Sequence, residues 1–249
     1  MSTPARRANV GPLMPAGRET WEAIAELAHV VPSELWAVVG GQMVAIHAAV
    51  AGVEPPRTTD DGDIVVDVRA HGRRAMQHVA GALVAARFLT TMSPEGVTRF
   101  ERGRAKIDLL APEGIGDHVE TVPPGFAVSA PGATQALSRC EDVTVDWGEG
   151  HAFIRCPSLL GAIIAKSAAS REIVSLTVDE RLKHQQDLVF LLSLAALGDT
   201  RAMAGELTAK DRRRLRAATD ALLADVDHRA WRAAINADDA RSTCGILLR

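Results

Sequence analysis

The stretch that decides the fold is LWAVVGGQMVAIHAAV at residues 35–50, followed after a short break by RTTDDGDIVV at residues 57–66. The apolar run before the glycine pair predicts a short buried strand, and the apolar spacing after it predicts a helix over residues 42–50. Gly40 and Gly41 join the two elements, because glycine allows backbone conformations and close approaches that other residues resist. A glycine pair at a helix N-terminus is typical of a phosphate-binding turn.

Two acids, Asp61 and Asp63, stand at the head of the next predicted strand, over residues 64–68. Side chains two positions apart on a strand point to the same face of a sheet. Two carboxylates on one face repel each other and are poor core material, yet they suit one or two Mg2+ ions held against a triphosphate. The sequence therefore predicts a phosphate site and a metal site within one short unit.

A third acid, Asp108, lies in the apolar run KIDLL at residues 106–110. This run is predicted to pair with a strand over residues 98–101 through a turn at Gly103. An unpaired buried carboxylate would cost several kcal/mol or become protonated, and a bound metal removes that penalty. The alternative is an ordinary alternating strand that places Lys106 and Asp108 on its solvent-facing side.

The pattern apolar-Gly-Gly followed by Arg-x-Thr-x-Asp-x-Asp-apolar resembles the nucleotidyltransferase superfamily, specifically its AbiEii and MenT-like branch of toxin nucleotidyltransferases. Residues 106–110 resemble the strand that delivers the third carboxylate of that family. Further along, Lys166, Arg171 and Asp187 resemble the downstream Lys, Arg and Asp motif of the branch. The resemblance spans roughly residues 36–192.

The resemblance implies an α+β fold, in which a nucleotidyltransferase-like core of a small mixed sheet with helices is followed by an α-helical domain. It implies Mg2+-dependent transfer of a nucleoside monophosphate from an NTP to the tRNA 3′ end, by the toxin of a toxin–antitoxin pair. The implied metal ligands, for one or two Mg2+ ions, are Asp61, Asp63 and Asp108. The implied catalytic residues are these three with Lys166 and Asp187, and the implied nucleotide-binding residues are Gly40, Gly41, Arg57, Thr59, Lys166 and Arg171.

One position departs from the family pattern, because the residue between the two acids is usually apolar and here it is Gly62. A glycine inside a strand weakens it or marks a bulge. This departure leaves open which acids converge on the metal, with Asp60 and Asp67 as the alternatives.

Each downstream residue also has a purely structural interpretation. Lys166 follows an apolar helical stretch and either extends its ammonium group to solvent or reaches an anion. Asp187 contacts the site or forms an exposed pair with Lys183 four residues earlier. Arg171 serves a triphosphate or the acceptor backbone, or ends a helix in solvent. Nearer the glycines, Arg57 and Thr59 either touch phosphate or shape the turn. A core or capping role is favoured for His47.

A basic run at residues 210–216 matches a contact with an RNA backbone, although such runs are usually the solvated face of a helix. Its cationic members are Lys210, Arg212, Arg213, Arg214 and Arg216. Aromatic residues make up only 4% of the chain and tyrosine is absent, so stacking on bases has few platforms. Any RNA contact is therefore expected to go through Lys and Arg to phosphate.

Composition places the chain among ordinary globular proteins. Its 249 residues are 47% hydrophobic and carry a formal net charge of −3, which gives no global signature of nucleic-acid binding. Its three cysteines, Cys140, Cys156 and Cys244, follow no metal-binding or disulfide spacing. The N-terminal stretch lacks the apolar segment of a secretory signal, and no run is long enough for a membrane helix, so a cytoplasmic protein is expected.

Three segments are predicted along the chain: a loose Pro/Gly/Ala arm over residues 1–17, the nucleotidyltransferase core over 18–156, and the α-helical domain over 157–249. In the core we expect helices over residues 20–30 and 73–86, a long connection over 111–131, and a strand or hairpin over 143–154. In the helical domain, Thr177 to Glu180 forms a capping box for a helix that ends near Leu197, and two more helices are expected over 208–224 and 227–236.

Three other functions compete with tRNA modification. One is the same chemistry on a small molecule, such as an aminoglycoside hydroxyl, or on a protein side chain. The second is a catalytically silent relative that binds nucleotide or a partner chain, which the unusual Gly62 supports. The third is an antitoxin-like regulator. A cognate antitoxin protein is the partner that the toxin hypothesis implies, and no membrane partner is expected.

Overall fold

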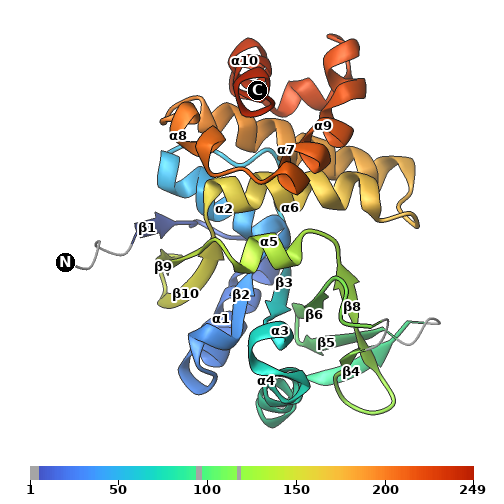
Figure 1. Cartoon of the computed structure of the whole chain (residues 1–249). Helices are drawn as coiled ribbons and strands as arrows, with labels where there is room; N and C mark the ends of the chain where they lie inside the picture. The colour runs from blue at the N-terminus through green and yellow to red at the C-terminus, as the bar shows by residue number, and fades with distance from the viewer. Residues whose placement is uncertain (1–5, 94–96, 117–118) are drawn as a thin grey trace.

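The computed structural model describes residues 6–93, 97–116 and 119–249. Within them, two β-sheets and their covering helices are followed by a half made of helices alone (Figure 1). The strands of the larger sheet are β2 (Trp36–Val38), β3 (Asp61–Val66), β4 (Leu89–Met92), β5 (Thr98–Arg102), β6 (Ala105–Pro112), β7 (Val119–Glu120) and β8 (Phe126–Ala130). The predicted α+β class is confirmed.

The larger sheet is mixed, with the order β2-β3-β6-β5-β4. Its central pair, β3 and β6, is parallel, while β2 runs antiparallel to β3 and β5 runs antiparallel to β6. β4 adds to the outer side of β5, and β8 runs parallel to the end of β6. Because β3 and β6 are neighbours, the acids predicted on these two strands are brought to the same part of the sheet.

The smaller sheet has three strands, β1 (Arg6–Asn9), β9 (Cys140–Asp146) and β10 (His151–Pro157), in the order β1-β9-β10. β9 and β10 form the hairpin predicted over residues 143–154. The prediction of a loose arm over residues 1–17 is wrong for its described part. β1 pairs in parallel with β9, with Ala8 fully buried, and the next helix already begins at Pro15. Residues 1–5 lie outside the described residues.

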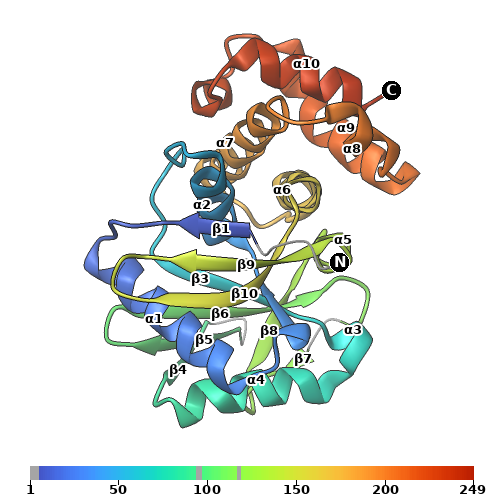
Figure 2. The same ribbon diagram turned by 90° about the vertical axis from the view of Figure 1, so that its left-hand side faces the viewer.

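Helices cover the two faces of the larger sheet unequally (Figures 1 and 2). One face packs against α1 (Pro15–Val30) and α4 (Arg73–Ala85), which bury Trp21, Ile24 and Met76 completely. On the other face α5 (Ala133–Leu137) covers only the apolar part around Val65. The short elements nearby are η1 (Ser33–Leu35) and α3 (Val68–His71). The uncovered part of the second face is left for polar side chains.

The second half contains α6 (Leu159–Glu172), α7 (Val178–Ala195), α8 (Thr200–Gly205), α9 (Ala209–Ala224), η2 (Arg229–Ala233) and α10 (Ala237–Leu247). The predicted capping box is confirmed, since Thr177 and Glu180 bond each other's backbone N–H groups at the start of α7. The second half of α7 is buried and packs against α6, α10 and η2. One hydrophobic cluster runs from the sheets into these helices without a break.

Other differences from prediction are local. The long connection over residues 111–131 contains β7 and β8, and the helix expected over 227–236 is the 3-10 turn η2 with α10 after it. The change from strands to helices falls at Pro157, where β10 ends and Ser158 caps α6. The domain boundaries at 18–156 and 157–249 stay predictions. Among the described helices, none has the length and apolarity needed to cross a membrane.

Candidate active site

Three carboxylates lie on one face of the central strand pair. Asp63 of β3 is directly opposite Asp108 of β6, and Asp61 lies two residues before Asp63 on the same face. We call Asp61, Asp63 and Asp108 the acidic row. The predicted convergence of these residues is thus observed in the register of the two strands, while their role as metal ligands stays a prediction.

The glycine pair allows the acidic row to lie against the start of α2 (Gly40–Ala51). A Cβ atom on Gly40 would lie 1.7 Å from Asp63 Oδ2, and one on Gly41 would lie 2.6 Å from Thr59 Oγ1. Gly40 also has a φ of 64°, a left-handed conformation that glycine adopts without strain. No side chain caps this end of α2. The close approach of Asp63 Oδ2 to Gly40 places this carboxylate at the positive end of the helix dipole.

Asp63 is the least compensated of the three acids. Loss of hydration and the neighbouring charge of Asp108 raise its pKa to about 6, and the opposing charge of Lys166 offsets only part of this. Within the described residues, its carboxylate accepts no hydrogen bond and forms no ion pair. A cation placed beside Asp63 would therefore be stabilised.

Gly62 does not create a bulge. The pairing of β3 with β6 continues through it, with Gly62 opposite Ile107. A Cβ at this position would come within 2.7 Å of Ile107 Cδ1 and 3.1 Å of Thr20 Cγ2. Because Thr20 belongs to α1, a larger residue here would displace α1 from the sheet. The departure from the family pattern is a packing feature on the face opposite the carboxylates.

The two alternative acids lie outside the row. Asp67 accepts a hydrogen bond from the backbone N–H of Ala70 at 3.1 Å and caps α3. Asp60 is exposed, and its backbone carbonyl, not its side chain, accepts a hydrogen bond from the Thr20 hydroxyl. The geometry thus favours Asp61 and Asp63 over both alternatives.

A second charged group surrounds Asp187 on α7. Lys166 Nζ of α6 donates to Asp187 Oδ2 at 2.7 Å, and Arg57 donates to both carboxylate oxygens at 3.1 and 2.8 Å. Lys166 and Asp187 are buried, and Arg57 is half-buried. We call these three residues the Asp187 cluster. The alternative pairing of Asp187 with Lys183 is not observed, and neither is an extended, solvent-facing Lys166.

The cations of the Asp187 cluster determine its protonation. Burial alone would raise the pKa of Asp187, but the charge of Lys166 and the hydrogen bonds from Arg57 outweigh it and hold the pKa below its usual value. Arg57 lies on the loop just before β3, and its charge and that of Lys166 both lower the pKa of Asp63. The Asp187 cluster therefore places two cations within electrostatic range of Asp63.

His184 lies one turn before Asp187 on α7 and was not predicted from the sequence. Its Nδ1 atom is buried without a hydrogen-bond partner. Burial and the nearby Lys166 lower its pKa to about 4, so the ring is neutral at pH 7. The sequence did contain a signal for His184. It lies three positions before Asp187 on a predicted helix, and residues three apart on a helix share a face.

Arg99 of β5 is a further residue that the sequence prediction missed. It lies opposite Asp108 in the β5–β6 hairpin and donates to both oxygens of that carboxylate, with Nε at 2.8 Å from Oδ1. Its guanidinium also reaches Asp61 Oδ2 at 3.9 Å. The signal was present, because a two-residue turn after Arg102 pairs Arg102 with Ala105 and so places Arg99 across from Asp108.

The donor chemistry of the acidic row fits Mg2+, which prefers carboxylate oxygens. Asp63 supports this, since burial first and the charge of Asp108 second raise its pKa, and a bound cation would offset both effects. As the described residues stand, however, no group of three or more acidic, histidine or cysteine side chains is arranged to hold a metal ion. Both oxygens of Asp108 are engaged by Arg99, so that ligand is not free in this arrangement.

Two predicted residues lie away from these clusters. Arg171 is exposed in the last turn of α6, and no contact joins it to either cluster. This position corresponds to the structural alternative, a helix end in solvent. His47 is buried on α2 with its Nε2 atom 2.9 Å from the carbonyl oxygen of Pro157, so the preferred expectation of a core histidine is confirmed.

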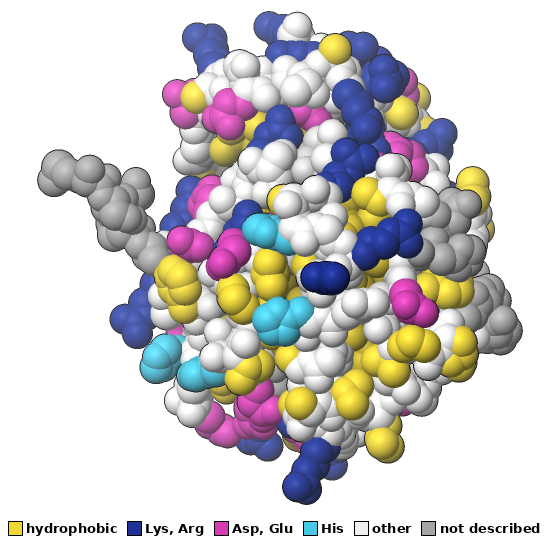
Figure 3. All heavy atoms as spheres, turned by 60° about the horizontal axis from the view of Figure 1, so that its bottom comes forward, with side chains coloured by type: hydrophobic (Ala, Val, Ile, Leu, Met, Phe, Trp, Pro, Cys, Tyr) yellow, Lys and Arg dark blue, Asp and Glu magenta, His cyan; other side chains and the backbone are white. Residues whose placement is uncertain are grey.

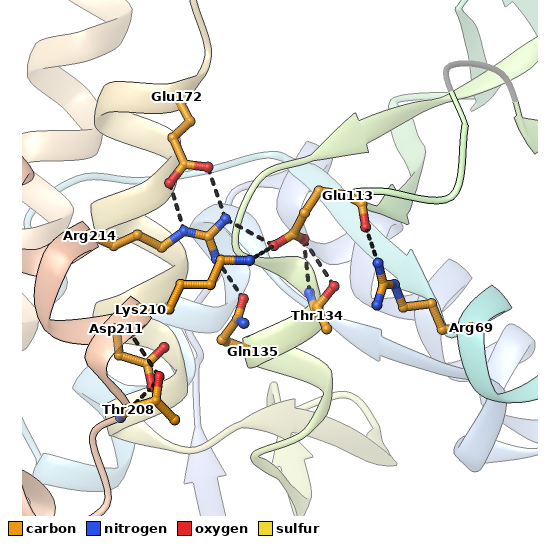
Figure 4. A network of polar contacts seen from close by, with 9 residues as sticks. All are labelled: Arg69, Glu113, Thr134, Gln135, Glu172, Thr208, Lys210, Asp211 and Arg214. Atoms are coloured by element: carbon orange, nitrogen blue, oxygen red, sulfur yellow. Dashed lines mark hydrogen bonds and ion pairs between the residues drawn. The ribbon is translucent and has the colours of Figure 1, made fainter.

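Most side chains of the basic run on α9 form ion pairs or hydrogen bonds within the molecule, and Figure 4 shows those of Lys210 and Arg214. Arg214 is only 6% exposed and bonds Glu172, Glu113 and Gln135. We call these four residues the arginine cluster. The other members differ in their partners: Lys210 lies 3.8 Å from Glu113, Arg212 bonds the carbonyls of Ala204 and Leu247, Arg216 bonds that of Leu248, and Arg213 is exposed, with no hydrogen bond or ion pair to the described residues. The run is therefore neither a free RNA-binding face nor a plain solvated one.

A hollow of about 930 Å³ lies between α1 and α4, lined mainly by apolar residues with His29 and His78 at its edge. These helices lie at the lower end of the molecule, where hydrophobic side chains gather beside histidines on the surface (Figure 3). α1 packs on the Gly62 side of the sheet, so the hollow is on the face opposite the acidic row. It contributes no residue to the two charged clusters.

No family model and no curated protein matches the chain. One solved structure that resembles it is described as the solution structure of the antibiotic-resistance factor ANT(2'')-Ia, which shows substrate-regulated conformation dynamics. The two chains are 16% identical, with a TM-score of 0.40, and the match covers 85% of this chain and 97% of that one.

Proposed function

We propose that the protein is a nucleotidyltransferase, which moves a nucleoside monophosphate from an NTP to an acceptor hydroxyl. The observation that carries the proposal is the meeting of the acidic row with the N-terminus of α2 and with the cations of the Asp187 cluster. In this reaction the acceptor oxygen attacks the α-phosphorus and a new P–O bond forms. The bond from the α-phosphorus to the bridging oxygen breaks, pyrophosphate leaves with that electron pair, and the hydroxyl proton passes to solvent.

The residues divide into two roles in this proposal. Lys166 and Arg57 supply positive charge for the triphosphate, and Asp187 is a positioning residue that keeps both side chains in place. Its low pKa and its three hydrogen bonds argue against a role as the base for the acceptor. A divalent cation held by the acidic row would supply charge neutralisation at the reacting phosphates.

The family resemblance makes the tRNA 3′ end one acceptor, and with it a toxin role and an antitoxin partner. The internal use of the α9 arginines weakens the RNA contact that the sequence predicted there. A tRNA backbone would have to use other cations, of which Arg171 and Lys183 are exposed, or Arg213, the exposed member of the run on α9.

A small hydroxyl-bearing molecule is the second acceptor, and one observation favours it. Asp61 retains 45% side-chain exposure at the rim of the acidic row. A half-exposed carboxylate beside the reacting phosphates suits a compact cationic acceptor such as an amino sugar better than a polyanionic RNA. We therefore rank a cationic small molecule beside tRNA as the acceptor to be tested.

The test is incubation of the intact protein with Mg2+ and each α-labelled NTP in separate reactions, with total tRNA, amino sugars or a protein extract as acceptor. The proposal predicts label on one acceptor class and an equal amount of released pyrophosphate. The Asp63→Ala variant is expected to lose both signals, and Asp220→Ala serves as the matched control on an exposed acid of α9.

Three outcomes separate the alternatives. Label transfer that survives Asp63→Ala refutes the assigned site. NTP binding without pyrophosphate release for any acceptor supports a silent relative instead. Growth that is unaffected when the wild-type gene is expressed alone argues against the toxin role, even if transfer is observed in vitro.

A further inference from the structure

We propose that Arg99 is a guanidinium gate on the acidic row, which a divalent cation must displace from Asp108 before the site is complete. The proposal rests on the nucleotidyl-transfer function above and assigns a positioning role to a residue that this function does not use. Arg99 touches no reacting atom in the structure, but it engages the carboxylate that would do so.

The register of three neighbouring strands aligns Arg99 with two of the acids. Asp63 of β3 lies opposite Asp108 of β6, and Asp108 lies opposite Arg99 of β5. The three side chains therefore stand in a line across one face of the sheet, perpendicular to the strands. Arg99 is at the end of this line, on β5, beside Asp108.

Arg99 contacts the three carboxylates of the acidic row unequally. It binds both oxygens of Asp108 and one oxygen of Asp61 at 3.9 Å, and among the described residues it has no contact with Asp63. A fork-shaped guanidinium can satisfy one carboxylate fully, but it cannot bridge all three as a metal ion would. The site thus keeps room for a further cation while its third ligand is held by Arg99.

Arg99 lies where its guanidinium can move away from Asp108 into solvent. Its side chain is 39% exposed, compared with 20% for Asp108. Release of the guanidinium would return it to solvent without opening a cavity in the core, and a bound triphosphate would give it a new anion to pair with. An ordinary structural salt bridge in the core would lack this route, as the 6% exposed Arg214 does.

The experiment measures Mn2+ binding alone, without nucleotide, by the loss of the free-ion electron paramagnetic resonance signal. Arg99→Gln removes the gate, and we expect about tenfold tighter Mn2+ binding than in the wild type. Arg99→Lys keeps the charge but loses the two-pronged contact, and it should also bind Mn2+ more tightly. The matched control is Arg102→Gln on the same strand, whose partners Glu26 and Ala86 lie away from the acidic row, and it should bind Mn2+ as the wild type does.

A second measurement follows the Arg99 guanidinium itself. In the wild type, the Nε–H resonance of Arg99, assigned by its absence in Arg99→Lys, should be protected from exchange and should lose that protection when Mg2+ is added. Equal Mn2+ affinity in the wild type and both Arg99 variants, or an Arg99 signal unchanged at saturating Mg2+, overturns the gate alone. Absence of Mn2+ binding in all variants overturns the gate and the metal-dependent function together.

Discussion

The acidic row and the arginine cluster are both dense groups of charge, but they differ in how completely the charges are matched. In the arginine cluster, Arg214 donates to two carboxylates and an amide, and Glu113 is further bonded by Thr134. In the acidic row, Asp63 has no partner among the described residues and Asp61 is half-exposed. The charges of the arginine cluster are paired, whereas in the acidic row Arg99 pairs Asp108 and leaves Asp63 unpaired among the described residues.

This difference separates a structural role from a functional one. A buried charge that is fully hydrogen-bonded fixes the position of its elements, here α9 and α6 against the end of β6 and α5. A carboxylate without a compensating cation or hydrogen bond destabilises the fold slightly, and such groups cluster at sites that bind ligands. Mutation of the acidic row should therefore lower activity with little effect on stability, and mutation of the arginine cluster should lower stability with little effect on activity.

The largest effect is expected on catalysis from Asp63→Asn. Loss of one ligand from the acidic row should remove roughly 4 kcal/mol of transition-state stabilisation, about a thousandfold in rate. The free energy of unfolding at pH 7.5 without metal should stay equal or rise, because a carboxylate with a raised pKa is removed from beside Asp108. Urea unfolding and single-turnover transfer would measure the two effects, and a large loss of stability would contradict the functional role.

Arg214→Met should show the reverse pattern. Removing the guanidinium leaves Glu113 and Glu172 without their shared cation in a half-buried environment, which costs about 3–5 kcal/mol of stability. The rate per folded molecule should remain near that of the wild type. Urea midpoints with activity measured well below the transition would check this, and the comparison breaks if activity falls while stability does not.

Acidification tests a group outside both clusters. Burial lowers the pKa of His47 to about 4, despite its contact with the Pro157 carbonyl, so below pH 6.5 the unfolded chain binds a proton that the folded protein does not. Stability should therefore fall as the pH drops from 6.5 towards 4, by up to roughly 3 kcal/mol from this residue. Urea unfolding of His47→Gln between pH 7.5 and 4.5 should show a shallower loss than the wild type, with His184 adding to the remaining loss and Asp63, whose pKa is raised to about 6, opposing it.

The smallest effect is expected from Arg213→Gln, which changes the exposed neighbour of Arg214. Its effect on the free energy of unfolding should lie within about 0.5 kcal/mol. If tRNA is the acceptor, the salt dependence of tRNA binding should weaken by about one phosphate contact, measured by filter binding at several salt concentrations. An unchanged salt dependence with tRNA labelling intact would show that α9 plays no part in RNA binding.

The acidic row was predictable because it depends on short-range patterns. Alternation on a strand places Asp61 and Asp63 together, and the apolar surroundings of Asp108 marked it as unusual. Arg99 was equally within reach, since the turn at Gly103 fixes the hairpin register that faces it towards Asp108. The strand β1 was missed because its short polar sequence gains stability only from pairing with β9, more than 130 residues later.

The arginine cluster could not be predicted in the same way. Its partners come from the end of β6, from α5, from α6 and from α9, and no local pattern tells which side of α9 faces them. A row of arginines has the same appearance in the sequence whether it binds phosphate or buried carboxylates. Only the packing of the helical half against the sheet distinguishes these cases.

The close fit at Gly62 restricts which substitutions can be accepted at this position during evolution. A methyl group at this position would collide with Ile107 and crowd Thr20, and both neighbours belong to the packed interior beneath the carboxylates. Homologues that carry a larger residue between the two acids should therefore have smaller side chains at these two places. Covariation among the three positions would trace how the unusual glycine arose.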